Sequence, residues 1–188
     1  MESLNIMALF FITIFILLAF LVVSIYNSLV KQNQLSDEAF SGIDVALKRR
    51  YDLIPNLVET VKGYAKHEQE TLTKVIAQRK LCEGSGSVEA RANNENILSG
   101  MLKSVFALSE AYPELKANTN FMKLQDSLDE IEDALQNARR YYNATVRDFN
   151  ILVKSFPSNI IANQFNFKEK EFFEITDMAQ KENVKVAF

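Results

Sequence analysis

The amino-terminal segment of this chain places the strongest constraint on its fold. No charged residue occurs between Glu2 and Lys31, and the run from Leu4 to Ile25 is almost wholly apolar. At a helical rise of about 1.5 Å per residue, this run reaches roughly 33 Å, which is enough to cross a hydrocarbon core of about 30 Å. The sequence therefore predicts a transmembrane helix at residues 4–25, with a short flank at residues 1–3 and the lipid bilayer as its partner.

A cleaved secretory signal is the alternative for this segment. Such a signal needs a basic amino-terminal region, a shorter apolar stretch and small residues at a cleavage point. The chain begins instead with acidic Glu2, and Ile25, Tyr26 and Asn27 stand where an Ala-x-Ala pattern would be needed. These flanks and the length of the run favour a retained anchor.

The composition of the remaining chain favours one helical domain. The 188 residues, less the anchor and a short tail, leave about 130 residues, which is enough to bury a core. Hydrophobic residues make up 48% of the sequence, and there are only 5 Gly and 3 Pro, so turn-rich sheet folds are poorly supported. The net charge of -3, with no basic run interleaved with aromatic residues, argues against a nucleic-acid partner.

The membrane helix has no stopping point at Ile25. Between Leu4 and Ile54 the only Gly or Pro is Gly42, and apolar residues continue in a heptad, coiled-coil-like phase. Pro55 interrupts this phase without shifting it, and a Pro inside a helix predicts either a kink or a break. The two heptad positions hold Tyr26, Asn33, Phe40, Leu47, Ile54 and Val61, and Leu29, Ser36, Ile43, Arg50, Leu57 and Tyr64.

Three further segments complete the predicted fold. A Gly/Ser loop at residues 83–87 precedes a helical pattern that runs from Val88 to Pro113, and a longer one runs from Asn118 or Thr119, as the cap, to Pro157. Short loops make neighbouring helices antiparallel. We therefore expect an all-α protein in which the transmembrane helix leads into an up-and-down bundle of long helices at residues 26–156. An aromatic tail with a short helix follows at residues 157–188.

The sequence offers no set of residues for catalysis or for binding a cofactor. The single histidine, His67, has no second histidine at helical spacing, and the single cysteine, Cys82, has no partner for a disulfide or a zinc site. Phosphate-binding and nucleophile-elbow motifs are absent from the sequence. We expect no enzymatic activity, no metal and no cofactor, with Cys82 serving as a small apolar core residue.

The basic cluster at residues 48–50 has three interpretations. Arg49 and Arg50 can attract anionic lipid, recognise an acidic partner, or pair with the acidic half of the last helix. Along an upright helix these residues lie roughly 35 Å beyond Ile25, past several Debye lengths, which weakens the lipid interpretation. Because Arg50 falls on the heptad seam, we favour a cross-helix ion pair with the acidic residues between Asp126 and Asp133.

Amide and aromatic side chains are the remaining interaction candidates. Asn33 lies on the first seam, and Asn143 and Asn150 are seven residues apart beside the last one. A buried Asn in a helical seam fixes register and oligomeric state at a cost in stability. In the tail, Phe165 and Phe167, like Phe172 and Phe173, should pack on the bundle or on another subunit, because exposed phenylalanine is unfavourable.

Several long, collinear motifs carry a resemblance to a known family. They are Tyr26-Asn27, LKRRYDLIPNLVETVKGYAKHE from Leu47 to Glu68, AYPELKAN from Ala111 to Asn118, ARRYYN from Ala138 to Asn143, Phe156-Pro157 and Phe165-Asn166-Phe167. Together they resemble the LemA family of bacterial membrane-anchored proteins, from whose pattern this sequence departs at Phe40, where Trp is expected. The resemblance implies a bundle of four helices, with a division near residues 52–55, and no established enzymatic activity. It points towards organisation of the envelope or of a membrane.

These observations predict a non-enzymatic, self-associating scaffold or adaptor that crosses the bacterial inner membrane once. Lys31 and the basic cluster make the carboxy-terminal flank of the span more basic than the Glu2 side, which favours a cytoplasmic bundle. A membrane protein is a further expected partner. The alternative is a receptor-like module that captures a peptide or small ligand in the bundle. An apolar groove lined by Phe, Tyr and Leu would favour that alternative.

Overall fold

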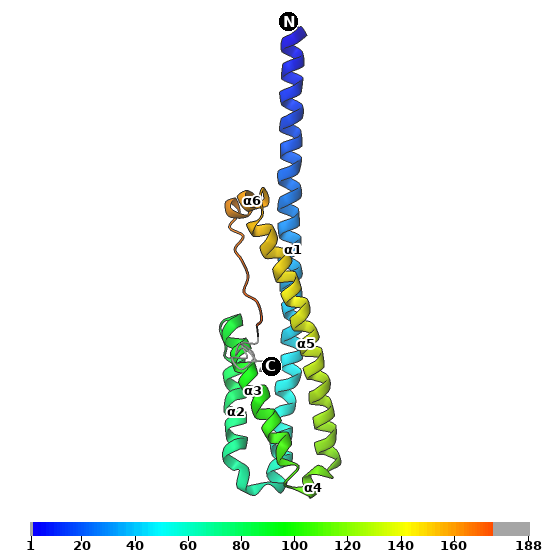
Figure 1. The fold of residues 1–188 in the computed structure, drawn as a ribbon, viewed down its shortest axis with the longest axis vertical. Coiled ribbons are helices and arrows are strands. Elements are labelled where there is room, and N and C mark those ends of the chain that lie inside the picture. The colour runs from blue at the N-terminus through cyan, green and yellow to red at the C-terminus, as the bar shows by residue number, and fades with distance from the viewer. Residues whose placement is uncertain (1, 175–188) are drawn as a thin grey trace, which may run out of the picture. The chain divides into compact units, whose positions relative to one another are not determined.

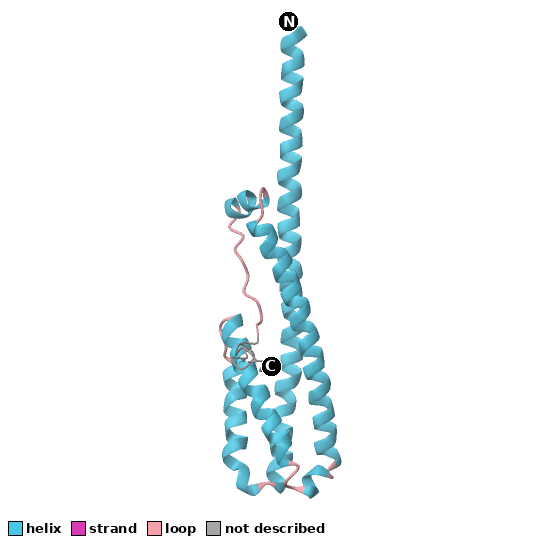
Figure 2. Cartoon of the chain, in the orientation of Figure 1, coloured by secondary structure: helices cyan, strands magenta, loops and turns pink. Residues whose placement is uncertain are grey.

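The computed structural model describes residues 2–174, and every regular element within them is a helix (Figure 2). Within these residues the chain forms two compact units. The first unit contains residues 2–39 and 141–170, and the second contains residues 40–140 and 171–174. Residues 175–188 of the predicted aromatic tail lie outside the described part of the chain.

Helix α1 (Glu2–Tyr64) is 63 residues long and continues through Pro55. Of the two alternatives at this proline, a break therefore does not occur, and the division that the family resemblance placed near residues 52–55 lies instead after Tyr64. A helical proline lacks the N–H that would bond the carbonyl four residues earlier, which here belongs to Tyr51. Arg79 Nε donates a 2.8 Å hydrogen bond to that carbonyl oxygen, so α2 supplies the donor that Pro55 lacks.

The second unit is an antiparallel bundle built from four long helical segments (Figure 1). Residues 40–64 of α1 lead through the short η1 (Lys66–Glu68) into α2 (Gln69–Glu83), which packs against α3 (Val88–Leu108). The short α4 (Pro113–Lys116) connects α3 to α5 (Thr119–Lys154). The buried apolar residues of this unit include Ile43, Leu47, Ile54, Leu57, Val61, Leu72, Val75, Leu98, Leu102, Val105, Leu128, Ile131 and Leu135.

Polar side chains cap the first turns of α3 and α5 in this bundle. The Ser87 hydroxyl accepts a hydrogen bond from the Ala90 N–H and caps α3. The Asn118 side-chain oxygen accepts hydrogen bonds from the N–H groups of Asn120 and Phe121, each at 2.9 Å. Both caps satisfy amides that would otherwise lack partners in the first turn of a helix.

The first unit combines residues 2–39 of α1 with the end of α5, the short α6 (Ser158–Gln164) and the chain that follows it. Its core is formed by Leu29, Phe149 and Ala162. Partly buried apolar residues pack around this core, namely Ile25, Leu152, Val153, Ile161 and Phe167.

Within the described residues, α1 alone is long and apolar enough to cross a membrane. Large side chains between Ile6 and Val23 are exposed rather than packed on other parts of the chain. An exposed run of this length and hydropathy is typical of a lipid-facing helix. The predicted amino-terminal span is therefore supported by length, composition and exposure.

The pairing of Arg79 with the Tyr51 carbonyl predicts a specific energetic coupling with Pro55. Replacing Arg79 with Met should lower the free energy of unfolding by about 1–3 kcal/mol, because the carbonyl loses its donor. In a Pro55→Ala background the helix supplies an N–H itself, so the same replacement should cost less. Denaturant unfolding of the full chain in detergent, arranged as a double-mutant cycle, measures this difference.

The cycle is controlled by Glu83→Gln, which removes the 3.0 Å ion pair of Arg79 with Glu83 and leaves the bond to the carbonyl in place. This replacement should cost the same amount with Pro or with Ala at position 55. Equal costs of Arg79→Met in the two backgrounds would contradict the proposed compensation.

Candidate functional site

The second unit contains a buried ion pair between α1 and α3. Arg50 Nη1 lies 3.3 Å from Glu95 Oε2, and the Arg50 and Glu95 side chains are 5% and 0% exposed. Arg50 also donates a 2.7 Å hydrogen bond through Nη2 to the Ser99 hydroxyl. Its Nη1 is 3.2 Å from Glu132 Oε2 on α5, so one guanidinium connects three helices.

Glu95 also affects two neighbouring protonated groups, the Tyr51 hydroxyl and the Cys82 thiol. Tyr51, the residue after Arg50, donates a hydrogen bond through its hydroxyl to Glu95 Oε1. Burial raises the pKa of the Tyr51 hydroxyl far above its usual value, and its hydrogen bond to Glu95 adds to this effect. Burial likewise raises the pKa of the Cys82 thiol, with a further contribution from the negative charge of Glu95. Both groups therefore keep their protons at neutral pH.

Arg139 on α5 is the second buried cation of this region. Its side chain lies over the Phe173 ring, with Cζ 4.9 Å from the ring centroid, and its Nε and Nη2 make no hydrogen bond with any residue in the described part of the chain. Burial lowers the pKa of Arg139, while the negative charges of Glu132 and Glu95 raise it. Arg50, Glu95, Glu132 and Arg139, called the charge cluster below, thus contain two cations and two anions.

A cavity of about 210 Å³ lies beside the charge cluster. Arg50 and Glu132 line its polar side, and Leu102, Phe106 and Leu128 form apolar walls. The remaining lining residues are Ser99, Lys103, Asp129 and Gln136. The lining is therefore mixed, with charges of both signs, rather than the aromatic apolar groove typical of peptide capture.

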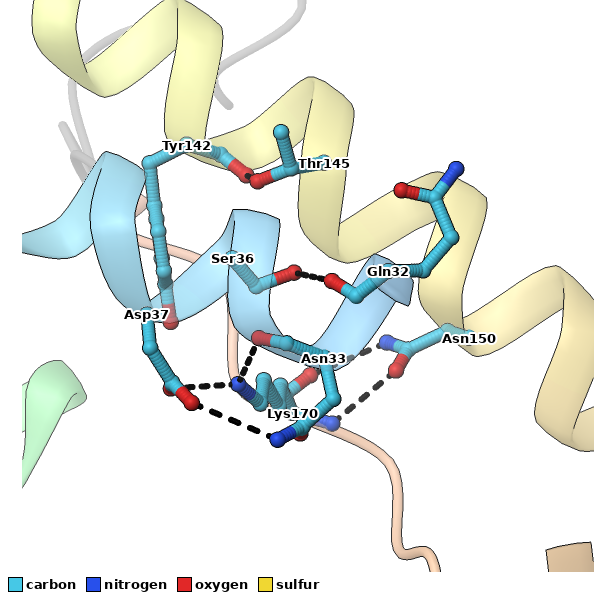
Figure 3. Close-up of polar contacts among 8 residues, drawn as sticks. All are labelled: Gln32, Asn33, Ser36, Asp37, Tyr142, Thr145, Asn150 and Lys170. Atoms are coloured by element: carbon cyan, nitrogen blue, oxygen red, sulfur yellow. Dashed lines mark hydrogen bonds and ion pairs between the residues drawn. The ribbon is translucent and has the colours of Figure 1, made fainter. Parts of the chain in front are cut away.

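The first unit contains a separate polar site, which holds the chain after α6 (Figure 3). Asn150 accepts a 2.9 Å hydrogen bond from the Lys170 N–H and donates one of equal length to the Lys170 carbonyl. The Lys170 ammonium contacts α1 through the Asn33 carbonyl at 3.1 Å and an Asp37 carboxylate oxygen at 2.6 Å. The Asn33 side chain in turn donates a 3.3 Å hydrogen bond to Asp37, so Lys170 contacts the side-chain amide of Asn150 but only the backbone carbonyl of Asn33.

The other predicted residues have different surroundings. The cross-helix ion pair favoured for Arg50 is present, whereas its neighbour Arg49 is exposed. Asn143 is only half-buried. Phe167 packs on the core of the first unit, while Phe165 is half-exposed and contacts Tyr26, with ring centroids 4.7 Å apart.

Sequence reasoning missed Glu95 and Arg139, although both leave a signal in the helical periodicity. Glu95 interrupts the buried stripe of α3 that is otherwise formed by Ala92, Leu98, Leu102 and Val105. Arg139 lies four residues after Leu135 and three before Tyr142, both of which are buried. A charged residue at an apolar position of an amphipathic stripe predicts a buried partner of opposite charge.

Comparison with known proteins identifies the family. The model of the LemA family matches residues 39–188, which is most of the chain. The chain belongs to the LemA family. This match confirms the resemblance carried by the sequence motifs. It covers the whole second unit and residues 141–170 of the first unit.

Individual relatives of this LemA-family chain include proteins of two kinds. Protein LemA of Metamycoplasma hominis is 26% identical, over 90% of this chain and 80% of the relative. Magnetosome protein MamQ 2 of Paramagnetospirillum magneticum is 23% identical over 79% of this chain. Magnetosome protein MamQ of Magnetospirillum gryphiswaldense is 21% identical over the same share. The match spans 64% of the length of each of these two magnetosome proteins.

The buried ion pair predicts that Glu95 is important for stability. Glu95→Gln preserves the shape of the side chain but leaves Arg50 short of a compensating charge in the bundle interior. We expect the free energy of unfolding to fall by about 3 kcal/mol, measured by denaturant unfolding of the full chain in detergent. The matched replacement Glu59→Gln, at an exposed position of α1, should change it by less than about 0.5 kcal/mol. Equal effects of the two replacements would contradict the importance of the pair.

Proposed function

We propose that this LemA-family chain is a non-enzymatic scaffold or adaptor, anchored in the membrane by residues 4–25. The observation that carries the proposal is α1 itself, one helix that contains the apolar run and also supplies a seam of the bundle. An anchor and a bundle that share a helix have no flexible peptide linker between them. Such an arrangement suits a protein that holds a surface near a membrane.

The chemistry of the second unit supports a structural role for its buried charges. Arg50 and Glu95 are buried and paired with each other, so each charge is already compensated within the bundle. Tyr51 and Cys82 keep their protons, which makes both of them poor nucleophiles at neutral pH. We propose that the charge cluster specifies how α1, α3 and α5 pack, a role for which buried ionic groups are suited.

Self-association is part of the proposal, with a membrane protein as a possible further partner. In the second unit α1, α2 and α3 each leave a large apolar side chain exposed, namely Val45, Leu81 and Ile97. We propose that these side chains contribute to the contact between copies of the chain, because removing apolar surface from water is favourable. Because two of the relatives are magnetosome proteins, we propose a role in organising a membrane or the envelope.

We further propose that the anchor lies in the bacterial inner membrane and that the bundle is cytoplasmic. Lys31, Lys48 and Arg49 are exposed on the carboxy-terminal side of the apolar run, while Glu2 lies on the other. Excess positive charge near a span favours the cytoplasmic side.

A receptor-like binding module is the second candidate function. The cavity beside Arg50 is the observation in its favour, because a guanidinium at a mixed pocket can bind a small acidic group. Its volume of about 210 Å³ is below the usual range for ligand sites, which begins near 300 Å³. The pocket therefore suits a small ligand better than a peptide.

The scaffold proposal predicts self-association of the full chain in detergent. Light scattering should give a protein mass above that of one chain, and this mass should fall on dilution. Replacing both Leu81 and Ile97 with Lys should shift the equilibrium towards the monomer, because burying a charged side chain at an apolar contact is unfavourable. The control is Lys80→Gln together with Lys103→Gln, which also changes the net charge by two units on the same two helices, in the opposite direction, and leaves Leu81 and Ile97 in place.

The control variant should associate as the unchanged chain does. A chain that stays strictly monomeric at all concentrations would contradict self-association.

A further inference from the structure

The first unit places an uncharged segment of the chain directly beside the end of the apolar run. Residues 155–167 contain no Asp, Glu, Lys or Arg, and α6 lies within them. Ala162 of α6 is in the core with Leu29, and Ile161 and Phe167 pack around the same core as Ile25. The segment at 155–167, called the interfacial segment below, is thus packed on α1 at the first turns beyond the predicted span.

Aromatic contacts fix the same level along α1. Tyr26, the first residue after the apolar run, has its ring centroid 4.7 Å from that of Phe165 and 6.0 Å from that of Phe167. Ile25 and Leu29 are separated by about 6 Å along the helix axis. The polar headgroup layer on each side of the hydrocarbon core is roughly 5–8 Å thick. If Ile25 lies at the edge of that core, α6 lies within the headgroup layer.

The interfacial segment leaves large apolar side chains exposed at this level. Phe156 is 80% exposed, Ile160 is 58% exposed and Phe165 is 52% exposed. Around them the segment carries Asn, Gln and Ser, which form hydrogen bonds with headgroups and water. Apolar side chains beside uncharged polar ones are typical of segments that lie in a membrane interface.

The charges at the ends of the interfacial segment fit a membrane surface. Lys154 precedes the segment and Lys168 follows it, and both are exposed, with the Lys154 ammonium 2.7 Å from a Glu169 carboxylate oxygen. Exposed Lys31 lies about 9 Å along α1 beyond Ile25. Lysine side chains that border an apolar membrane element extend towards the lipid phosphates.

We propose that the interfacial segment lies in the headgroup layer of the same bilayer that holds residues 4–25, with Phe156 and Ile160 inserted at the edge of the acyl chains. This inference rests on the anchoring proposed above. The segment is continuous with the proposed membrane anchor, because it packs on the first turns of α1 beyond the apolar run. The first unit then contacts lipid through two elements, a span and a surface helix.

The absence of Trp from the sequence allows a direct test. Each of four variants of the full chain carries one Trp, at Phe15 in the span, at Phe156 or Ile160 in the interfacial segment, or at Tyr141 on α5. Tyr141 is the matched control, because it is exposed and belongs to the first unit. It lies about 20 Å along the helix axis from Lys154, the last residue of α5. The proteins are reconstituted into phosphatidylcholine vesicles whose acyl chains are brominated at defined depths.

We expect Phe156→Trp and Ile160→Trp to lose emission roughly two-fold in brominated vesicles, most strongly with bromine near the headgroups. Phe15→Trp should be quenched most strongly with bromine near the chain ends. Tyr141→Trp should be quenched by aqueous acrylamide and not by bromine.

Three results would overturn the inference, and they are distinguishable. If Phe15→Trp is quenched by bromine while Phe156→Trp and Ile160→Trp respond only to acrylamide, the anchor holds and the interfacial segment is in water. If these two residues are shielded from both quenchers in a concentration-dependent way, a second copy of the chain covers them. If Phe15→Trp itself is not quenched by bromine, the proposed anchoring fails and the inference fails with it.

Discussion

The structure depends on α1 remaining helical through Pro55. Before this proline the helix carries the apolar run, Leu29 of the first core, and Leu47 and Ile54 of the bundle; after it the helix carries Leu57 and Val61 of the bundle. The hydrogen bond that the proline removes is replaced by Arg79, whose Nε reaches the Tyr51 carbonyl. A break at Pro55 would fall inside the second unit, because residues 40–64 of α1 all belong to it, and would separate Leu57 and Val61 from the bundle residues that precede the proline.

The charge cluster shows a related use of polar groups inside the bundle. A buried ion pair contributes little net stability, because removing two charges from water is about as unfavourable as their attraction is favourable. The pair has a larger effect on alternative packing registers of the helices. A register that separates Arg50 from Glu95 is unfavourable, because it leaves two uncompensated charges in the interior. The hydrogen bonds to Tyr51 and Ser99 further restrict the geometry in which the pair is satisfied. The cluster therefore favours one arrangement of α1, α3 and α5.

Much of the fold follows from sequence patterns of short range. The apolar run, the heptad seam through Leu47, Ile54 and Val61, and the Asn118 cap depend on neighbours within a few turns. The continuity of α1 at Pro55 was not predictable in this way, because Arg79 is 28 residues from Tyr51, whose carbonyl it bonds, and belongs to another helix. For the same reason the heptad pattern indicates Asn33 and Asn150 as seam residues, whereas the link that Lys170 makes between the Asn150 side chain and the Asn33 backbone carbonyl depends on a contact 137 residues apart.

Helix α1 is one helix from the apolar run into the bundle. Hydrogen exchange of the backbone amides of residues 20–64, measured on the full chain in a lipid bilayer, tests this continuity most directly. We expect slow exchange throughout this range, including residues 26–31 beyond the span and the turn that contains Pro55. Fast exchange confined to residues 26–31 or to residues 51–56 would contradict the claim, because it would reveal a flexible joint.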